Sequence, residues 1–357
     1  MKKNFWKNRK VFITGHTGFK GSWLTLILSG LKAKIAGYAL DPISKPNLFY
    51  GLGLGKLLEK DHRKNILNLK HLKLAVDNFK PSIVFHLAAQ SSVLVSYDRP
   101  LDTINVNVTG TANVLNVLRS CKSVRSVIIV TTDKVYLNLE KNFPFNENDN
   151  LGGNDVYSGS KAAAEIITQS FKKSFFSKNT KCKIATARSG NCIGGGDWTK
   201  DRILKDCAES FLKQKKLKIR SPNATRPWQH VIEPLFGYIK LSERLFSNKK
   251  YEGAWNFGPN PRSDLTVLEV VRFGKKFLKS KSKIVIKKNK HYESKYLSLN
   301  SKKSEKYLKW KTILNAKQAL KLSYDWYRFY DQNISKNKIV EFTLKQISDY
   351  KKKLRIL

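Results

Sequence analysis

The sequence predicts an α/β fold in which a doubly wound parallel sheet is joined to a smaller, irregular α/β lobe toward the C-terminus. Its 357 residues suffice for one large domain or two coupled ones. Hydrophobic residues make up 41% of the chain and aromatic residues 11%, which supplies a core and excludes a disordered chain. In the first half, short β-branched runs alternate with stretches of helical periodicity, the pattern of a parallel sheet covered by helices on both faces.

The elements of the first half follow from these periodicities. Runs of apolar and β-branched residues predict strands at residues 10–14, 33–39, 82–86, 126–131 and 183–188. Apolar residues at spacings of three and four predict helices at residues 20–31, 69–79, 101–120 and 156–173. We therefore expect a sheet domain over residues 1–190.

The second half is less regular. Beyond Asn191, Gly and Pro residues interrupt the pattern, which predicts a smaller lobe over residues 191–334, from which the chain can cross back to the sheet. Residues 335–357 are Lys-rich but predict a C-terminal helix, because four apolar residues form a stripe at Ile339, Phe342, Leu344 and Ile347.

The net charge of +41 comes from 68 Lys plus Arg against 27 Asp plus Glu. Such a balance is typical of proteins that bind nucleic acids or anionic surfaces. Here the basic residues are spread over the whole chain and are mostly Lys rather than Arg, the residue favoured for bidentate phosphate contacts. We interpret the charge as a coding bias and expect no specific nucleic-acid partner. A nucleic-acid binder built on the same core remains a remote alternative.

Cysteine usage and hydropathy bear on the compartment. The four cysteines show no CxxC spacing and have no nearby His, so neither a metal site nor a disulfide framework is expected. No stretch reaches the ~20 apolar residues of a spanning helix, and the basic N-terminus is not followed by the apolar segment of a signal peptide. These features favour a cytoplasmic protein with no membrane partner.

A glycine loop follows the first predicted strand and precedes the first helix, at residues 15–21 (GHTGFKG). Gly15 permits a tight turn, Gly18 lets backbone N–H groups approach a pyrophosphate, and Gly21 lets helix and strand pack closely. Asp41 follows the next strand, where it can accept hydrogen bonds from an adenosine ribose and favour NAD over NADP. These positions predict a Rossmann-type dinucleotide site, although Asp41 could instead only begin a turn before the proline that follows it.

Two polar groups predict chemistry at the same sheet edge. Tyr157 and Lys161 are four residues apart and so share one helix face. Lys161 should favour the tyrosinate form, which makes Tyr157 a candidate base for a sugar hydroxyl. The segment that begins Thr132-Asp133-Lys134 follows a buried strand, and ligands bind at the carboxyl ends of strands in open α/β sheets. An ordinary polar strand end is the alternative.

Several further segments carry a resemblance to a known family. They are residues 15–24 (GHTGFKGSWL), 85–90 (FHLAAQ), 107–111 (NVTGT), 132–136 (TDKVY), 152–165 (GGNDVYSGSKAAAE), 190–198 (GNCIGGGDW), 226–234 (RPWQHVIEP) and 254–259 (AWNFGP). The chain resembles the extended short-chain dehydrogenase/reductases almost end to end, and within them the CDP-glucose 4,6-dehydratases. The glycine loop and the Tyr/Lys pair specify only the superfamily, whereas the last three segments are more diagnostic.

This resemblance implies a lyase that uses tightly held NAD to convert CDP-glucose to CDP-4-dehydro-6-deoxy-glucose and water, for deoxysugar and surface-polysaccharide synthesis. Tyr157 would take the C4 hydroxyl proton, Thr132 would bind near the 4-oxygen, and Asp133 would protonate the departing C6 hydroxyl. Relatives that act on dTDP-glucose or GDP-mannose generally have Glu where this chain has Lys134. Whether Lys134 removes the C5 proton, for which it must be neutral, or stabilises the enolate stays open.

The resemblance also implies binding residues and an assembly. Cofactor contacts beyond those above are Thr17, Phe19, Lys20, Asn65, Ile66, Leu87, Ala88, Ala89, Gln90, Asn107, Tyr157, Lys161 and Arg188. Substrate contacts are Ser92, Asn191, Arg202, Arg220, Arg226 and His230. Relatives pair through the helices that carry the Tyr/Lys segment, which implies a homodimer or homotetramer.

Other side chains have more than one interpretation. Trp198 and Trp228 either wall the pocket or belong to the core, while His16 is interpreted as positional and His86 as a buried, hydrogen-bonded residue.

The chain departs from the family pattern at two places. Asn65 stands where relatives usually have an Asp on the adenine, which predicts a weaker contact, and Tyr292 replaces a His of the outer lobe. A dehydratase or C4 epimerase for dTDP-glucose, GDP-mannose or UDP-glucose is the alternative within the superfamily.

Overall fold

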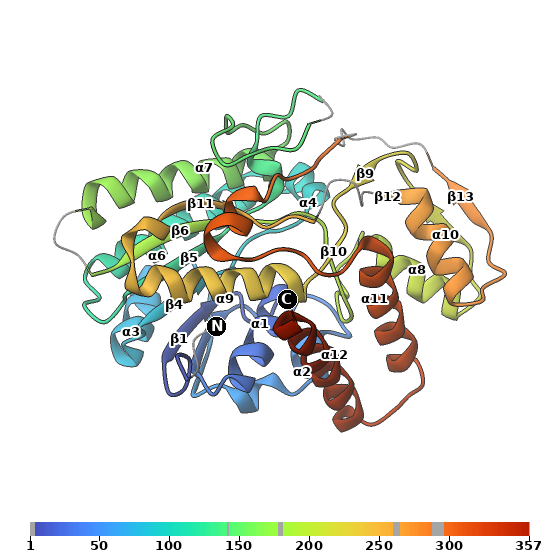
Figure 1. Ribbon diagram of the computed structural model, residues 1–357, viewed down its shortest axis with the longest axis horizontal. Coiled ribbons are helices and arrows are strands. Elements are labelled where there is room, and N and C mark those ends of the chain that lie inside the picture. The colour runs from blue at the N-terminus through green and yellow to red at the C-terminus, as the bar shows by residue number, and fades with distance from the viewer. Residues whose placement is uncertain (1–3, 141–142, 178–180, 260–264, 288–295, 357) are drawn as a thin grey trace.

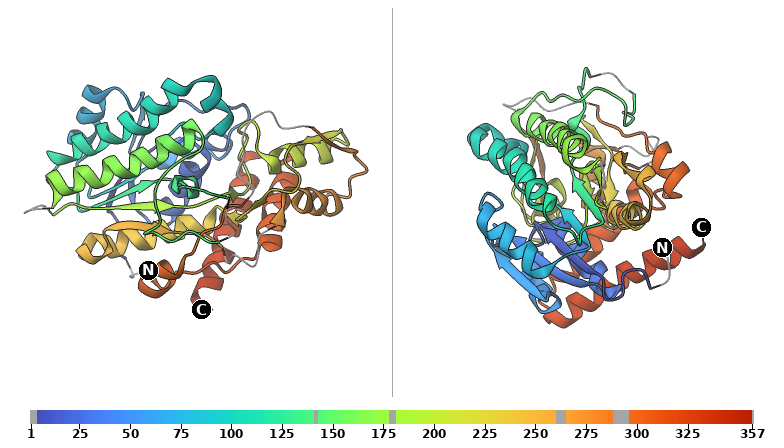
Figure 2. Two further views of the ribbon diagram at one scale, coloured as in Figure 1. Left: turned by 90° about the horizontal axis from the view of Figure 1, so that it is seen from above. Right: turned by 90° about the vertical axis from the view of Figure 1, so that its left-hand side faces the viewer.

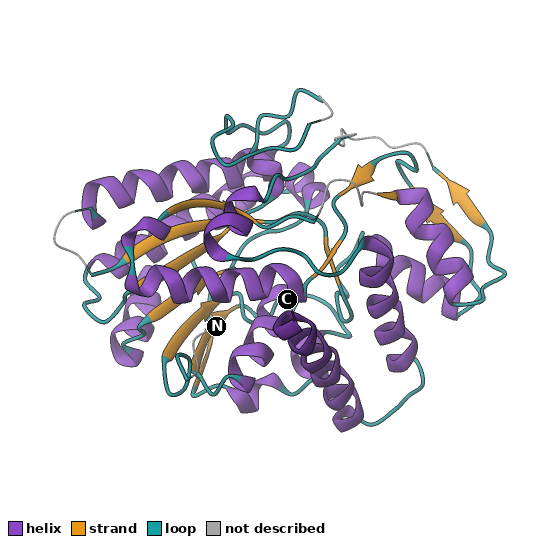
Figure 3. Ribbon diagram, viewed as in Figure 1, coloured by secondary structure: helices purple, strands orange, loops and turns teal. Residues whose placement is uncertain are grey.

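A computed structural model of the chain describes residues 4–140, 143–177, 181–259, 265–287 and 296–356. Its centre is a seven-stranded sheet in the order β11-β6-β5-β4-β1-β2-β3, in which every neighbouring pair is parallel (Figures 1 and 3). The strands are β1 Lys10–Thr14, β2 Lys34–Ala39, β3 Lys60–Arg63, β4 Ile83–His86, β5 Ser126–Val130, β6 Lys183–Arg188 and β11 Gly253–Asn256. This order reverses at β1, as in doubly wound dinucleotide-binding folds, and confirms the predicted fold class.

Helices cover both faces of the sheet (Figure 2). One layer contains α3 (Leu69–Phe79), α6 (Gly110–Arg119) and α7 (Val156–Phe171), and the other contains α1 (Phe19–Gly30) and α9 (Ile232–Ser247). Alternate residues of β1 enter the two cores, because successive side chains of a strand point to opposite faces. Phe12 packs with the core under α3 and α6, while Val11 and Ile13 pack with the core under α1 and α9.

Two strands and one helix differ from the sequence prediction. Strand β3 is the polar edge segment KDHR and β11 is the four-residue segment GAWN, so neither shows an apolar run. The helix expected over residues 101–120 begins one residue earlier, as α5 (Pro100–Ile104), and passes through a π-helical turn at Asn105–Thr109 before α6. The other predicted elements of this half agree with the structure to within one or two residues.

The second lobe is built from short elements beside one end of the sheet. Its helices are α8 (Ile203–Leu212), α10 (Val267–Phe277) and α11 (Ala316–Tyr330). Its two-stranded sheets pair β7 (Cys192–Ile193) with β10 (Gln229–His230), β8 (Leu217–Ile219) with β13 (Ile284–Ile286), and β9 (Thr225–Arg226) with β12 (Leu265–Thr266). Between them the chain returns to the main sheet, where it adds α9 and the edge strand β11.

The C-terminal helix α12 (Lys336–Ile356) packs against α11 and α9. The Phe342 ring stacks on Phe329 with centroids 4.3 Å apart, and Thr343 accepts a hydrogen bond from the Trp326 indole at 2.9 Å. The helix was predicted, but one member of its apolar stripe was wrong. Leu344 is 40% exposed, because the buried stripe instead runs through Thr343 and Tyr350.

The remaining helical segments are short. They are α2 (Leu48–Gly51), α4 (Val93–Asp98), the 3-10 turns Leu54–Leu57, Asp133–Val135 and Lys249–Tyr251, and the π turns Lys172–Phe176 and Ser304–Leu308. Among the described residues, no helix combines the length and the apolar character that crossing a membrane requires.

Candidate active site

A cavity of about 760 Å³ lies at the carboxyl ends of the central strands and continues into the second lobe. Its inner part is lined by the glycine loop and by residues that follow β4, β5 and β6, and its outer part by basic residues around α8 and β8. This is the place where open α/β sheets bind ligands, because the loops after the strands diverge on either side of the point where the strand order reverses.

The glycine loop packs closely against its own backbone and against the segment after β4. Gly15 has a φ of +74°, and a Cβ there would come within 2.6 Å of the Ala88 backbone nitrogen. A Cβ on Gly21 would lie 2.1 Å from the Gly15 carbonyl oxygen. The loop leads into the N-terminus of α1, whose unpaired N–H groups favour a phosphate. These features fit the pyrophosphate of a dinucleotide.

The adenosine end of the cavity contains Asp41, Asn65 and Ile66, as the sequence predicted. Asp41 accepts a hydrogen bond from the Tyr50 hydroxyl at 3.0 Å, and its side chain is 70% exposed. The Asn65 side-chain oxygen accepts the Leu67 N–H at 3.0 Å, so only its second lone pair is left for an adenine amino group. Asp41 therefore remains accessible to a ribose, and the contact of Asn65 is expected to be weak.

The two histidines near the loop are structural. His16 is fully buried, bonds to Asp61 at 2.9 Å, and has its pKa lowered by burial. His86 lies between two threonine hydroxyls, Thr14 at 2.7 Å and Thr111 at 3.1 Å, and burial lowers its pKa to about 3. Both are neutral near pH 7, and Thr14 in turn accepts the N–H groups of residues 87 and 88 that border the cavity.

The polar segment after β5 meets helix α7 inside the cavity. Thr132 caps the 3-10 turn and donates to Asp133 Oδ1 at 2.9 Å. Asp133 is 2% exposed, and no described group hydrogen-bonds its Oδ2 atom. A Cβ on Gly190 would lie 1.8 Å from that oxygen, so the missing side chain makes room for it. Lys134 and Tyr157 line the same space.

Burial raises the pKa of Tyr157, while the neighbouring Thr132 side chain and the charges of Lys20 and Arg202 act to lower it. Burial, followed by repulsion from Lys20, lowers the pKa of Lys161 to about 8. Lys161 donates to the Val130 carbonyl at 3.0 Å. Lys20 and Arg202 are thus cations whose charges act to lower the pKa of Tyr157, and the stabilisation of tyrosinate by Lys161 stays a prediction.

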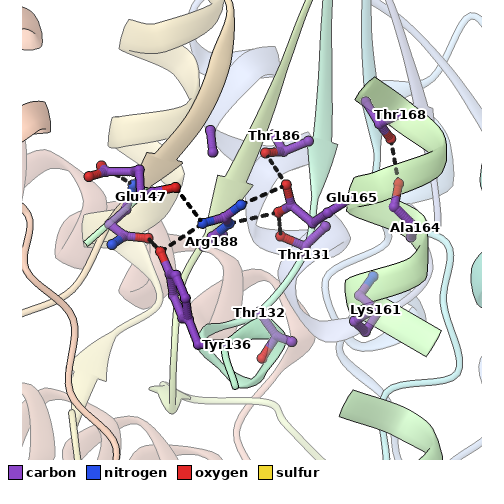
Figure 4. Close-up of polar contacts among 12 residues, drawn as sticks. Thr131, Thr132, Tyr136, Glu147, Lys161, Ala164, Glu165, Thr168, Thr186 and Arg188 are labelled. Atoms are coloured by element: carbon purple, nitrogen blue, oxygen red, sulfur yellow. Dashed lines mark hydrogen bonds and ion pairs between the residues drawn. The ribbon is translucent and has the colours of Figure 1, made fainter. Parts of the chain in front are cut away.

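A buried ion pair fixes α7 against the strands (Figure 4). Glu165, one turn beyond Lys161, accepts Arg188 Nε at 2.9 Å and the hydroxyls of Thr131 and Thr186 at 2.6 Å each. Arg188 is 1% exposed and does not line the cavity. The resemblance had implied a cofactor contact for Arg188. The structure instead uses its guanidinium to join β6 to α7.

Three other residues implied as contacts do not line the cavity. They are Gln90, Asn107 and His230. The Gln90 side-chain amide donates to the Ser92 carbonyl at 2.9 Å and to Thr103 at 2.8 Å. Asn107 accepts the Gln90 backbone N–H at 2.9 Å and donates to Ser160 at 2.9 Å. His230 is fully buried, its Nδ1 accepts the Ile232 N–H at 3.4 Å, and burial lowers its pKa to about 3. These side chains lie behind the residues that line the cavity and hydrogen-bond to other parts of the protein.

The other predicted residues do lie along the cavity. They are Thr17, Gly18, Phe19, Lys20, Leu87, Ala88, Ala89, Ser92, Lys161, Asn191, Arg202, Arg220 and Arg226. Thr17 does so with its side chain bonded to the Leu40 carbonyl at 2.9 Å. Trp198 and Trp228 line it too, and both also pack in the core. Each therefore serves both as a pocket wall and as a core residue. Tyr292 lies outside the described residues.

The sequence missed part of the lining. Ser189 and Cys192 face the inner cavity, and Lys200, Lys205, Lys218 and Lys287 surround the outer part. No pattern separates these four lysines from the many others of the chain, because their positions depend on how short strands of the second lobe pair. Within the described segments, no three His, Cys, Asp or Glu residues gather in a way that could hold a metal ion.

Comparisons with known proteins agree with this geometry. The profile of the GDP-mannose 4,6-dehydratase family matches residues 12–322. A CDP-glucose 4,6-dehydratase of Salmonella typhimurium is 38% identical over 354 residues, which cover 98% of each chain. The solved structure of a Bacillus anthracis dTDP-glucose 4,6-dehydratase in complex with NAD has a TM-score of 0.75 at 21% identity and covers 91% of this chain and 98% of its own. A Thermotoga maritima UDP-glucose 4-epimerase has a TM-score of 0.77 at 19% identity and covers 90% and 99%.

Proposed function

Since the chain belongs to the GDP-mannose 4,6-dehydratase family, we propose that it converts CDP-D-glucose to CDP-4-dehydro-6-deoxy-D-glucose and water with NAD as its cofactor. The observation that carries the proposal is the 38% identity, over 98% of the chain, to a CDP-glucose 4,6-dehydratase. The cavity supports it, because one continuous space joins a dinucleotide loop, a buried Tyr/Lys pair and a buried acid.

The residues of the glycine loop fit NAD, since the tight turn at Gly15 and the close packing at Gly21 lead the loop into the N-terminus of α1, and Asp41 is accessible to a ribose. Thr17, Gly18, Ala88 and the start of α1 would hold the phosphates. When bound, NAD supplies a hydride acceptor for C4 of the sugar and returns the hydride to C6.

Tyr157 removes the proton of the C4 hydroxyl. Its hydroxyl is buried, beside the Thr132 side chain, and near cations that favour the ionised form. Thr132 lines the same space, and if its hydroxyl proton turned from Asp133 to the 4-oxygen it would orient the sugar on Tyr157. The resulting ketone acidifies the hydrogen at C5, which prepares the loss of water.

Asp133 protonates the departing C6 hydroxyl. Its Oδ2 atom lacks a hydrogen-bond partner among the described residues and borders the cavity beside Gly190, so a proton carried there would face the substrate. Lys134 borders the same space. It acts at C5, either as a neutral base or as an ammonium that stabilises the enolate.

Basic residues at the outer end would hold the diphosphate. Arg226 is 5% exposed and lines the cavity, and Arg202 and Arg220 line it beside Asp197 and Asp201. Arginine is suited to this role because its planar guanidinium can bind two phosphate oxygens at once.

The test is to incubate the purified protein with NAD and, in separate tubes, CDP-glucose, dTDP-glucose, UDP-glucose and GDP-mannose, and to measure the sugar mass. Loss of one water from CDP-glucose alone is the expected result. Loss from another nucleotide sugar would keep the reaction and change the substrate. A change of sugar configuration without loss of water, detected by chromatography, would indicate an epimerase.

We also propose that the protein acts in the cytoplasm, in deoxysugar synthesis for surface polysaccharides, as a homodimer or homotetramer. Helices α5 and α7 leave apolar side chains exposed, with Leu101 at 72% and Ile166 at 53%, which supports pairing through this face. Light scattering of the purified protein would measure the mass of the assembly.

A further inference from the structure

We propose that Lys20 is the second cation of the catalytic centre and stabilises the ionised form of Tyr157. This inference rests on the proposed function in that Tyr157 is taken as the base. Lys20 belongs to the glycine loop and begins the first turn of α1, where the sequence alone predicts only cofactor binding. In the structure its side chain borders the same inner cavity as Tyr157, Lys161 and Ser189.

Three elements hold the Lys20 ammonium. Its Nζ donates to Ser189 Oγ at 2.8 Å, and Ser189 Oγ lies 2.6 Å from the Tyr238 hydroxyl. Ser189 follows β6 and is 2% exposed, while Tyr238 comes from α9 and is fully buried. The two hydroxyl groups thus join the lysine of α1 to β6 and α9.

No carboxylate of the described residues forms an ion pair with Lys20. An ammonium inside a protein is costly unless a negative charge compensates it. Burial acts to lower the pKa of Lys20, whereas Cys192, Tyr238 and Tyr157 act to raise it, and the net direction is upward. A tyrosinate formed during the reaction would be the compensating charge.

The charges around Tyr157 come from several elements. Lys20 from α1 and Arg202 from the segment before α8 act to lower the pKa of its phenol, and Asp133 after β5 acts to raise it. Lys161 lies one helical turn beyond it and bonds to the strand end. Repulsion from Lys20 also lowers the pKa of Lys161, whereas Glu165 raises it. Lys20 is therefore placed to influence both members of the Tyr/Lys pair.

The experiment replaces Tyr157 by a fluorinated tyrosine and follows its ionisation by fluorine NMR across a pH titration, without NAD or a nucleotide sugar. Lys20→Met should raise the apparent pKa of residue 157 by about one unit or more, which lowers its ionised fraction at neutral pH about tenfold. Lys20→Arg should restore most of the shift, because it keeps the charge. Lys34→Met removes an exposed lysine of β2 and should leave the titration unchanged.

Ser189→Ala removes the hydrogen bond to the Lys20 ammonium and keeps its charge. It should therefore raise the pKa of residue 157 by less than Lys20→Met does. If Lys20→Met fails to fold, as judged by circular dichroism, Ser189→Ala and Lys20→Arg still decide the question. An unchanged pKa in Lys20→Met, or an equal shift in Lys20→Met and Lys20→Arg, would overturn the proposal. Where Lys20→Met does not fold, an unchanged pKa in Ser189→Ala would overturn it. Because no substrate is present, this outcome is distinct from failure of the proposed reaction, which the mass measurement tests.

Discussion

The inner and outer ends of the cavity are built differently. At the inner end, the polar side chains come from long elements of the central sheet and are held by buried bonds, such as the Glu165–Arg188 pair at 2.9 Å. At the outer end, Arg220 comes from a short segment, is 42% exposed, and pairs with Asp201 at 2.9 Å. The fixed end suits chemistry, which depends on position, and the exposed end suits capture of a charged ligand, which depends on net charge.

Removing the base from the inner end should have the largest effect. Tyr157→Phe keeps the ring but loses the group that takes the C4 proton, so turnover should fall by ~10³-fold while NAD stays bound. The rate is measured as water loss from the sugar by mass spectrometry, and NAD binding by calorimetry. Tyr307→Phe, on a 53% exposed tyrosine, is the matched control and should be neutral. Normal turnover of Tyr157→Phe would remove Tyr157 from its assigned role.

Removing the acid from the inner end should slow mainly the loss of water, which follows oxidation at C4. Asp133→Asn keeps the shape and loses the proton donor, so water loss should slow by about 10²-fold. Oxidation at C4, followed by the absorbance of reduced NAD after rapid mixing, should change far less. Equal loss of both steps would mean that Asp133 only positions the segment after β5.

Two glycines near the catalytic residues test how closely the inner end is packed. A Cβ on Gly190 would meet Asp133 Oδ2 at 1.8 Å and Pro227 at 2.9 Å, so Gly190→Ala should displace Asp133 and slow water loss by about tenfold or more. Gly159 lies on α7, next to the same site, but a Cβ there meets nothing within 4 Å. Gly159→Ala should keep the activity and stabilise the protein by ~0.5–1 kcal/mol. The melting temperature and the turnover of the two variants are measured side by side. Equal effects of Gly190→Ala and Gly159→Ala on both quantities would contradict the prediction.

At the outer end a single change should have the smallest effect. Arg220→Ala should raise KM about threefold to tenfold with kcat unchanged, because an exposed charge contributes little and acts equally before and during the reaction. The difference from wild type should shrink at high salt. Arg272→Ala, on the exposed side of α10, is the control. A fall in kcat would mean that Arg220 also orients the sugar.

The two ends also differ in how far the sequence predicts them. The inner strands and helices repeat apolar residues over whole elements, so their bounds, the glycine loop and the Tyr157/Lys161 pair could be read directly. The edge strand β3 could not, since its polar residues carry no alternation. The sequence also could not predict the structural role of Arg188, because its ion pair with Glu165 joins residues that only tertiary packing brings together. In the outer end, the cavity lysines are indistinguishable from surface lysines until the lobe is folded.

The return of the chain to the sheet limits how the two parts can move and be divided. Helix α9 and strand β11 come from the middle of the second half, so the chain passes between the sheet and the outer lobe near residues 190, 231 and 258. A fragment that ends near residue 190 would lack the edge strand and the helix that buries one face of β5 and β6, and it would expose apolar surface. Crossings of the chain at these three places therefore connect the two parts. A hinge on a single linker is excluded by this connection, so the cavity can change shape only through small movements of the outer lobe.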